Sequence, residues 1–212
     1  MAHENTVTLQ GIYGSDESHA LSAWTSTSRE LTPEKVARIP KLLKMLAEGS
    51  DGADHGTPFE KSAIHFLVDG EIASHIHALK HRIGVSINGQ SARYGELKED
   101  KFYIPHDWPQ DQKQALEEHC MESFAKYHKT LAELIASGMD RKRAKESARF
   151  YLPYATMLLW DIQFNFRSFL HFIHLRNKPG AQLEIREIAQ EMLRLVQDDG
   201  RFKYSLEAYG IS

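Results

Sequence analysis

Residues 110–137 form the longest regular pattern in the sequence and set the scale of any structure that the chain can adopt. Apolar side chains recur there three and four residues apart, which is the spacing of one buried face on an amphipathic helix. Gly138 follows, and glycine often ends a helix. Cys120 lies on the apolar face, which predicts a small core residue. The face consists of Leu116, Cys120, Phe124, Tyr127, Leu131 and Leu134.

The other patterns predict strands and helices in mixed order. Thr32 and Pro33 are typical of a capped helix start, and Pro40 must either kink the helix that follows or begin a new one. Because the elements lack strand–helix–strand regularity, we predict a single α+β domain over residues 1–212. We expect strands at residues 7–13, 59–68, 101–105 and 154–164, and helices at residues 18–28, 33–49, 71–80, 140–148, 165–176 and 181–196, with a short helix at the end.

The composition is ordinary for a globular protein with one sizeable core: 212 residues, 42% hydrophobic and 26% charged. The formal net charge of −3 does not favour non-specific nucleic-acid binding. Cys120 is the single cysteine, which excludes an internal disulfide and a cysteine-based zinc cluster and fits a reducing cytoplasm. We expect no signal peptide at the start of the sequence and no membrane span, because no apolar run approaches ~20 residues.

A cationic stretch at residues 80–94 is the first candidate for a binding site. It opens with Lys80, His81 and Arg82, continues through small residues with many backbone N–H donors, and ends on Ser-Ala-Arg-Tyr. No carboxylate lies between Glu71 and Glu96, although acids outnumber bases over the chain. Such a stretch suits a phosphorylated small molecule. The alternative is a surface loop with a few charges.

A second window without acids lies between Asp161 and Glu184. On a helix, Arg167, His171 and His174 share one face, because residues three and four apart are neighbours. Two cationic windows in a net-acidic chain suggest that the fold brings them together around an anion. Two independently solvated faces remain the alternative. The window contains Asn165, Arg167, His171, His174, Arg176 and Lys178.

The histidines suggest a metal site, but their surroundings argue against one. His77 and His81 are four residues apart, His171 and His174 are three apart, and either spacing on a helix could bind zinc. Neither pair encloses the glutamate of a His-Glu-x-x-His site. The cations beside them, Lys80, Arg82 and Arg167, would repel a metal ion, so we expect none.

Covalent catalysis by the protein has little support in the sequence. Ser91 lacks the glycine pattern of a nucleophile elbow. Cys120 lies beside Glu117 and Glu118, which should raise its pKa. Neither a Rossmann Gly-x-Gly-x-x-Gly nor a P-loop is present, so any nucleotide must be held in another way.

Four stretches, in order and spacing, resemble the flavin-dependent thymidylate synthases from about residue 30 to the end of the chain. The family signature is Arg-His-Arg, seven residues and Ser, usually continuing to Arg-Tyr; here eight residues separate Arg82 from Ser91. The others resemble the family's His-x-Thr-Pro-Phe-Glu, Arg-x-x-Leu-Pro and Asn-x-Arg-Ser … Leu-Arg … Ala-Gln-x-Glu-Ile runs. The four begin at Lys80, His55, Arg149 and Asn165.

The resemblance implies an α+β fold with a mixed or antiparallel sheet packed by helices, assembled as a homotetramer with active sites between subunits. It implies FAD as the cofactor, dUMP as the nucleotide, methylenetetrahydrofolate as the one-carbon donor and NADPH as the reductant. Hydride would pass from the reduced flavin to the uracil ring without an enzyme nucleophile, in agreement with the missing activated Ser or Cys. The implied partners are these small molecules, without nucleic acid or membrane.

The resemblance also implies roles for individual residues. Ser91 and Arg93, with the backbone around Gly89 and Gln90, should hold the nucleotide phosphate, and Arg149 should reach it from a neighbouring subunit. Arg176 should be catalytic, stabilising negative charge on the uracil oxygens. The expected dUMP residues are His77, Lys80, Gly89, Gln90, Ser91, Ala92, Arg93, Arg149 and Arg176, and the expected FAD residues are His55, Thr57, Lys80, His81, Arg82, Asn88, Asn165, Arg167 and His171.

The chain departs from the family pattern at the expected active site. Lys80 replaces the first signature arginine and lacks its planar fork. One extra residue falls between Arg82 and Ser86, Gly89 stands where the family has a glutamate, and His77 and His171 replace the usual Gln and Asn. Thymidylate synthesis is the first expectation. Hydroxymethylation of a deoxypyrimidine nucleotide, and a flavin-binding homologue without turnover, are the alternatives.

Overall fold

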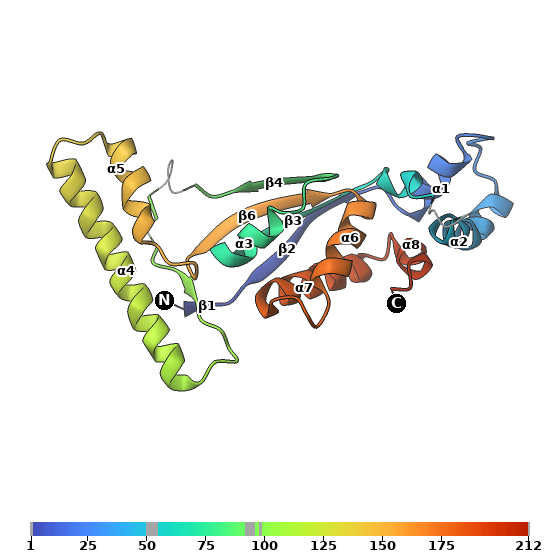
Figure 1. Cartoon of the computed structure of the whole chain (residues 1–212). Coiled ribbons are helices and arrows are strands. Elements are labelled where there is room, and N and C mark those ends of the chain that lie inside the picture. Colours follow the sequence, from blue (N-terminus) through green and yellow to red (C-terminus); the bar gives the residue numbers. More distant parts are fainter. Residues whose placement is uncertain (1, 50–54, 92–95, 98, 212) are drawn as a thin grey trace. The chain divides into compact units, whose positions relative to one another are not determined.

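The computed structural model describes residues 2–49, 55–91, 96–97 and 99–211 (Figure 1). Its described residues divide into two compact units. We call residues 2–6, 68–80 and 88–161 the α4 unit, and residues 7–67, 81–87 and 162–211 the α6 unit, after a helix in each. The expectation of one domain over residues 1–212 stays a prediction. The mixture of helices and sheet agrees with the expected α+β class.

The larger sheet in the described part of the chain has the strand order β2–β3–β6–β4. Its strands are β2 (Thr6–Tyr13), β3 (Ala63–Glu71), β6 (Met157–Phe164) and β4 (Val85–Gly89). Burial alternates along β3, where Ile64, Phe66 and Val68 are fully buried, as expected of a strand with one face in the core. β4 pairs with β6 at one edge of this order.

Strand β4 and the start of β3 differ from the sequence expectations. Residues 85–89 were expected to lie in a loop, but their side chains alternate in burial and the segment pairs as a strand. The expected strand at residues 59–68 instead begins at Ala63, after a 3₁₀ turn η1 (Thr57–Glu60), and continues through Asp69 and Gly70. Pro58 lies at the start of that turn, where its fixed φ angle suits a helical turn and its missing N–H would weaken a strand.

In the α4 unit, the long helix α4 (Gln110–Ala136) and α5 (Arg141–Ala148) pack side by side (Figure 1). Asp140 caps α5 by accepting hydrogen bonds from the N–H groups of Lys142 and Arg143, as its sequence position predicted. The expected apolar face of α4 is confirmed, and its core contains Leu97, Phe102, Cys120, Phe124, Tyr127, Leu131, Ala144 and Ala148.

The other elements of the α4 unit are short. β1 (Ala2–His3) pairs in parallel with β5 (Phe102–Tyr103). Helix α3 (Ile72–Ala78) is capped by Glu71, whose side chain accepts a hydrogen bond from the backbone N–H of Ser74. The 3₁₀ turn η2 (Arg149–Tyr151) follows α5 directly. Because α3 ends at Ala78, His81 lies beyond it. The predicted helical pairing of His77 with His81 is therefore wrong.

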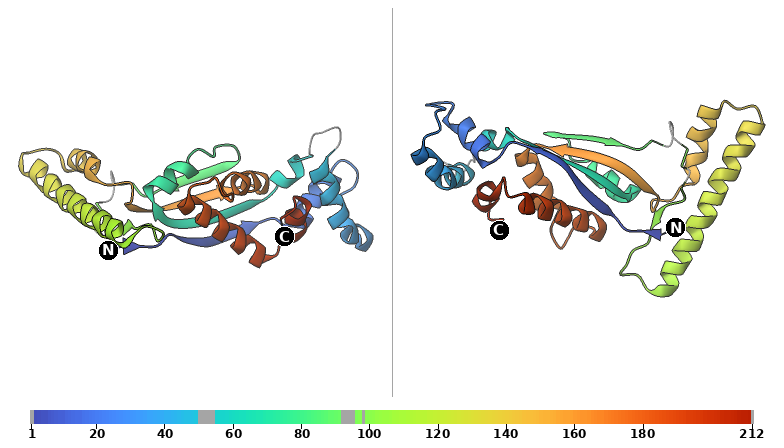
Figure 2. Two further views of the ribbon diagram at one scale, coloured as in Figure 1. Left: turned by 60° about the horizontal axis from the view of Figure 1, so that its bottom comes forward. Right: turned by 180° about the vertical axis from the view of Figure 1, so that it is seen from behind.

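In the α6 unit, α1 (Asp16–Trp24), α2 (Pro33–Glu48) and α8 (Lys203–Ala208) pack together (Figure 2). Thr32 caps α2, and the helix continues through Pro40, so the possibility of a new helix start at Pro40 is wrong. Helices α6 (Phe166–Arg176) and α7 (Leu183–Asp199) pack against each other, in the ranges that periodicity predicted. In the described residues, no helix combines the length and apolar character that a membrane span requires.

A buried polar network joins α1, α8 and the start of β3. Asp16 accepts hydrogen bonds from the backbone N–H groups of Tyr204 and Ser205 and from the Ser205 hydroxyl. His19 lies 2.9 Å from Ser205 Oγ through Nδ1 and 3.0 Å from Ser62 Oγ through Nε2. Because the Ser205 hydroxyl donates to Asp16, it accepts from His19, which places the proton of His19 on Nδ1. Each ring nitrogen of His19 thus has a neutral partner.

Candidate active site

Helix α6 carries most of the second cationic window, and its first turn is tied to the residues after His81. Asn165 caps the helix by accepting from the backbone N–H of Ser168 at 2.8 Å, and its own backbone N–H donates to the Gly84 carbonyl at 3.0 Å. The Ser168 hydroxyl donates to the Ile83 carbonyl at 2.7 Å. The first cationic window is thereby anchored at residues 83–84 to the helix that carries the second.

Gly84 is required by this anchor. Its φ of +64° lies in the left-handed region, and a Cβ atom there would come within 2.3 Å of both Asn165 Nδ2 and Ser168 Oγ. A side chain at position 84 would therefore add backbone strain and push the turn away from α6. The sequence analysis did not single out Gly84; its position between the cationic residues and β4 was the available signal.

In the same first turn of α6, Arg167 connects the helix with the turn that carries His55 and Thr57. Its guanidinium pairs with Glu60, with 3.0 Å between Nη1 and Oε1. It also lies directly over Gly56, where an added Cβ atom would be 2.4 Å from Arg167 Cζ. His55, Thr57 and Arg167 are all exposed. The start of α6 thus contacts two other segments that contain predicted flavin residues or follow them directly: the turn with His55 and Thr57, and residues 83–84 after Arg82.

At the far end of α6, Arg176 contacts His81. Arg176 Nε donates a hydrogen bond of 3.0 Å to His81 Nε2. The His81 ring packs edge-on against Phe172, with 4.9 Å between ring centres, and lies 6.0 Å from the His171 ring. The expectation that the fold brings the two cationic windows together is confirmed for these residues.

The electrostatics of this contact keep His81 neutral. Burial, the positive charge of Arg176 and the proximity of His171 lower the pKa of His81 to about 4. His81 is 8% exposed, so few water molecules can stabilise an imidazolium. Burial also lowers the pKa of Arg176 from its ordinary value, which still leaves a charged guanidinium at neutral pH.

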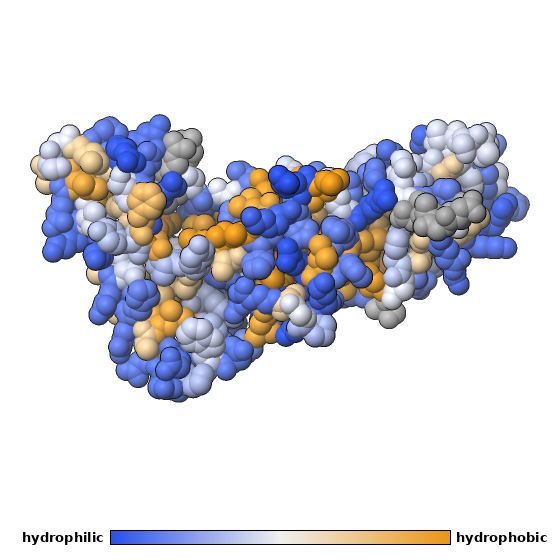
Figure 3. Space-filling model, in the orientation of Figure 1, coloured by the Kyte–Doolittle hydropathy of each residue, from blue (hydrophilic) through white to orange (hydrophobic). Residues whose placement is uncertain are grey.

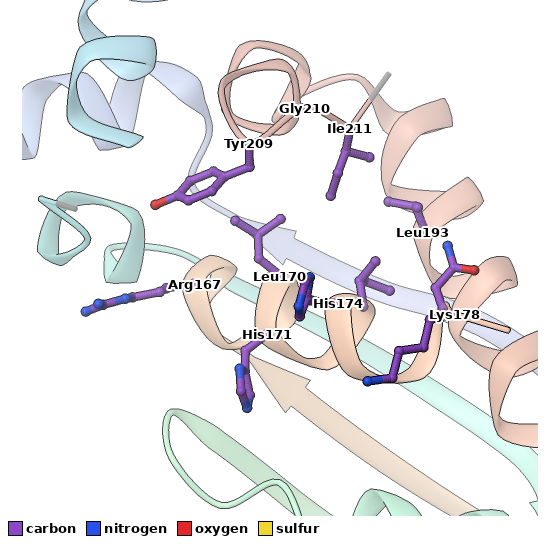
Figure 4. A pocket seen from close by; sticks show the side chains of 11 residues that line it. Arg167, Leu170, His171, His174, Lys178, Leu193, Tyr209, Gly210 and Ile211 are labelled. Atoms are coloured by element: carbon purple, nitrogen blue, oxygen red, sulfur yellow. The ribbon is translucent and has the colours of Figure 1, made fainter. Parts of the chain in front are cut away.

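A cavity of about 630 Å³ lies beside α6 within the same unit (Figure 4). Arg167, His171 and His174 line it from the helix, and Lys178 lines it from beyond the helix end, so the predicted shared face of Arg167, His171 and His174 is confirmed. Its other walls are apolar side chains and the end of the chain near Tyr209. The remaining lining residues are Leu170, Ile173, Asn177, Leu193, Tyr209, Gly210 and Ile211.

The donor set of the α6 unit fits an anionic planar cofactor. Arg82, Arg167 and His171 are exposed donors, which suit the phosphate groups of a dinucleotide. Gly56, which is buried, leaves room for the Arg167 side chain above the turn that carries Thr57. Of the expected FAD residues, His55, Thr57, His81, Arg82, Asn165, Arg167 and His171 belong to the α6 unit, while Lys80 and Asn88 belong to the α4 unit.

The expected nucleotide residues that the structure describes, apart from Arg176, belong to the α4 unit. His77 lies on α3, Lys80 is exposed beyond its end, and Arg149 is exposed at the start of η2. Ser91 is half-buried after β4. Ala92 and Arg93 lie outside the described residues.

Gln90 extends the pairing of β4 with β6. Its backbone N–H donates to the Leu159 carbonyl at 2.7 Å, and its side-chain Oε1 accepts from the Leu159 N–H at 3.2 Å. The backbone N–H of Gln90 is therefore already used in the sheet. It cannot also donate to a phosphate, as the expectation for the backbone around Gly89 and Gln90 would require of it. Gly89 packs against His75, and a Cβ atom at position 89 would lie 3.0 Å from the His75 ring.

A second cavity, of about 300 Å³, lies beside Gln90 in the α4 unit. Asp69, Glu96 and Glu99 line it together with Lys101, which pairs with Glu99, so acidic groups outnumber basic ones and the walls do not favour a phosphate. The basic character that the sequence showed between Glu71 and Glu96 therefore does not extend to this side of Gln90. A phosphate held by Ser91 has to lie away from this cavity.

Two other chemical possibilities can be compared with the structure. Among the described residues, no group of three or more His, Cys, Asp or Glu side chains could hold a metal ion. Cys120 is fully buried, and burial, with a smaller contribution from Glu117, raises the pKa of its thiol to about 11. The expectation that Cys120 is a small core residue is confirmed.

Comparisons with known proteins come from sequence and from structure. The family model described as thymidylate synthase complementing protein matches residues 9–199. The flavin-dependent thymidylate synthase of Streptomyces avermitilis is 27% identical over 211 residues, covering 88% of this chain and 84% of that protein. The enzyme of the same name from Clostridium tetani is 32% identical over 192 residues, covering 84% and 74%.

A similar solved structure is the UMP/dUMP methylase PolB from Streptomyces cacaoi bound with 5-Br dUMP. Its TM-score is 0.78 at 25% identity, and the match covers 99% of this chain and 96% of that chain. The same methylase bound with 5-Br UMP matches equally well, with a TM-score of 0.78. The likeness therefore extends over nearly the whole chain in both sequence and structure.

Proposed function

The chain belongs to the thymidylate synthase complementing protein family, that of the flavin-dependent thymidylate synthases, and from this premise we propose that it is an FAD-dependent thymidylate synthase. The proposed reaction is the reductive methylation of dUMP to dTMP, with methylenetetrahydrofolate as the carbon donor and NADPH as the reductant. The observation that carries the proposal is the contact of Arg176 with His81 at the end of α6, on the helix that also bears Arg167 and His171.

The residues that would hold the flavin surround α6. Arg82, Arg167 and His171 would bind its phosphates, and His55, Thr57 and Asn165 would line it. When bound, the reduced flavin would supply the hydride. The protein's part is then to bind, orient and shield the reacting groups, and the buried Phe172 supports the His81 ring from within the core.

Arg176 is the proposed catalytic residue. Its guanidinium is partly desolvated and remains charged, so it can stabilise negative charge that develops on the pyrimidine oxygens. Low exposure strengthens that interaction, because water competes less for the guanidinium. No covalent enzyme intermediate is required, in agreement with the buried Cys120 and its raised pKa.

The nucleotide phosphate would be held by Ser91, together with Arg93 and with Arg149 from a second copy of the chain. We propose a homotetramer in which such sites form between subunits. Exposed apolar side chains support assembly: Ile83 is 90% exposed, Phe150 beside Arg149 is 81% exposed, and Figure 3 shows apolar patches among the polar surface. Size-exclusion chromatography with light scattering tests this, and a monomer at micromolar concentration would contradict it.

The first test of the function is flavin binding. The purified protein should take up FAD and become yellow, and with NADPH and methylenetetrahydrofolate present the reduced flavin should be reoxidised only after dUMP is added. A protein that takes up no FAD, or whose flavin does not respond to dUMP, would contradict the proposal. We place the enzyme in the cytoplasm, where Cys120 stays reduced and these co-substrates are available.

The nucleotide substrate and the transferred one-carbon group each have a second candidate. The similar methylase PolB was solved with both 5-Br dUMP and 5-Br UMP, which favours offering UMP beside dUMP. The departures at Lys80, His77, Gly89 and His171 keep hydroxymethylation as the alternative to methylation. The product mass distinguishes the two transfers, and the nucleotide that is consumed identifies the substrate.

A further inference from the structure

The hydrogen bond between Arg176 and His81 fixes the protonation of His81. Arginine Nε carries a proton and can only donate, so His81 Nε2 must accept with its lone pair. The His81 proton then resides on Nδ1, and the ring is neutral. A protonated ring would lose this hydrogen bond and place two positive charges side by side.

Among the described residues, the charged and titratable groups that act on His81 favour the same neutral state. Arg176 and His171 face it from α6, and Lys80 and Arg82 flank it on its own segment, so the surrounding side chains are cationic or titratable bases. Phe172 covers one edge of the ring. The ring therefore serves as a neutral acceptor in a cationic environment, an unusual use of histidine that needs a reason.

We propose that His81 is a positioning residue for Arg176: by accepting from Nε, it orients the guanidinium and so directs the terminal nitrogens toward the pyrimidine. This inference rests on the proposed function for the identity of the ring that Arg176 meets. The inference also gives two neighbouring residues of the Lys80-His81-Arg82 stretch different roles. His81 acts on the nucleotide through Arg176, whereas its neighbour Arg82 is exposed and suits the flavin phosphates.

Two amide substitutions at one position give a matched test. In His81→Gln the amide reaches the place of Nε2 and can still accept from Arg176, whereas in His81→Asn it reaches only the place of Nδ1. Loss of a hydrogen bond to a charged group corresponds to about a ten- to hundredfold change in rate. We expect His81→Asn to lower kcat by about that factor and His81→Gln to recover to within about fivefold of wild type.

The affinity for FAD separates positioning from a direct flavin contact. Both variants should bind FAD within about threefold of wild type, because the proposed donors to the flavin phosphates, Arg82, Arg167 and His171, are unchanged. Equal losses of kcat in the two variants, or a loss that appears only as weaker FAD binding, would overturn the inference. Arg176→Lys adds a check: combined with His81→Asn, it should cost little more than the worse single change.

A measurement without substrate keeps this inference independent of the proposed function. Histidine side-chain nitrogen NMR of the wild-type protein at about pH 6, where exposed histidines are partly protonated, should show neutral rings with the proton on Nδ1 for both His19 and His81. The His81 signal is the one that should disappear in His81→Asn, while the His19 signal remains. An imidazolium, or a proton on Nε2, would overturn the inference even in an active enzyme. The expected tautomer in a protein without turnover would reject the function alone.

Discussion

His19 and His81 are both buried histidines of the α6 unit with pKa values lowered to about 4, yet their surroundings differ. His19 is fully buried, hydrogen-bonded to two serine hydroxyls, and surrounded by the rings of Phe59, Phe166 and Phe202. His81 accepts a hydrogen bond at Nε2 from the charged Arg176, and its ring lies near that of His171.

The difference teaches that a lowered pKa alone does not identify a functional histidine. Around His19 the cause is burial, and its partners are neutral groups that connect α1, α8 and the start of β3. Around His81 positive charges add to burial, and the partner is a candidate catalytic residue. The contacts of His19 stabilise the fold, whereas the contact of His81 orients the Arg176 guanidinium for the proposed substrate. Substitutions should separate the two.

The largest expected effect is on the His81 side. Arg176→Ala should lower kcat by about a thousandfold or more, because the charge opposite the pyrimidine oxygens is lost. FAD affinity should stay within about threefold, since the flavin donors remain. Steady-state kinetics and flavin titration measure both.

A matched control removes a positive charge elsewhere. Lys129 is exposed on α4, where it pairs loosely with Glu133, and Lys129→Ala should keep wild-type kcat. Turnover by Arg176→Ala at the level of this control would refute the catalytic role of Arg176.

The next effect is on stability, at the other histidine. His19→Ala leaves a cavity and removes the partners of Ser62 and Ser205, so the free energy of unfolding should fall by about 3 kcal/mol. His81→Asn should cost about 1 kcal/mol, because its ring lies nearer the surface. Urea unfolding measures both. A larger stability loss at His81 than at His19 would reverse the comparison.

Acid should affect stability through His19 in a defined direction. The unfolded pKa is near 6.5 and the folded pKa is about 4, so the unfolded state binds more protons between these values. The stabilisation from neutral His19 is therefore full above pH 6.5 and is lost as the pH falls toward 4. Between about pH 7 and pH 5, wild type should lose about 2 kcal/mol more than His19→Ala. Equal losses would show that His19 does not titrate this way.

The last comparison concerns the anchor beside His81. Gly84→Ala should lower the free energy of unfolding by about 2 kcal/mol and also lower kcat, because the new Cβ pushes the turn away from Asn165 and Ser168. Gly138→Ala is the control: its φ is also positive, at +89°, but no atom lies within 4 Å of the added Cβ. We expect a cost of about 1 kcal/mol there and unchanged kcat. Equal costs in the two variants would mean that the contacts with α6 are unimportant.

The sequence predicted the elements with long periodic faces. Helices α4, α6 and α7 appeared near their expected bounds because three- and four-residue spacing extends over many residues. The strand β4 was missed because five residues with Ser, Asn and Gly look like a loop. Its pairing with β6 depends on residues about seventy positions away, such as Leu159, which local patterns do not contain.

For the site, the sequence identified the residue types but not their contacts. The two cationic windows were visible from the absence of acids, and it was predicted that the fold would bring them together around an anion. That Arg176 would contact His81, and that Gly84 would have to approach Asn165, follows from tertiary packing and could not be read from spacing. The same holds for Gln90, whose N–H is engaged by Leu159.

The most direct test of the proposed chemistry is the mass of the nucleotide product. The protein, loaded with FAD, is incubated with dUMP, UMP, methylenetetrahydrofolate and NADPH, and the nucleotides are separated and weighed by mass spectrometry. We predict that dUMP gains about 14 mass units, the difference made by one methyl group, and that Arg176→Ala forms no such product. Unchanged dUMP, or a gain of about 30 mass units from a hydroxymethyl group, would contradict thymidylate synthesis.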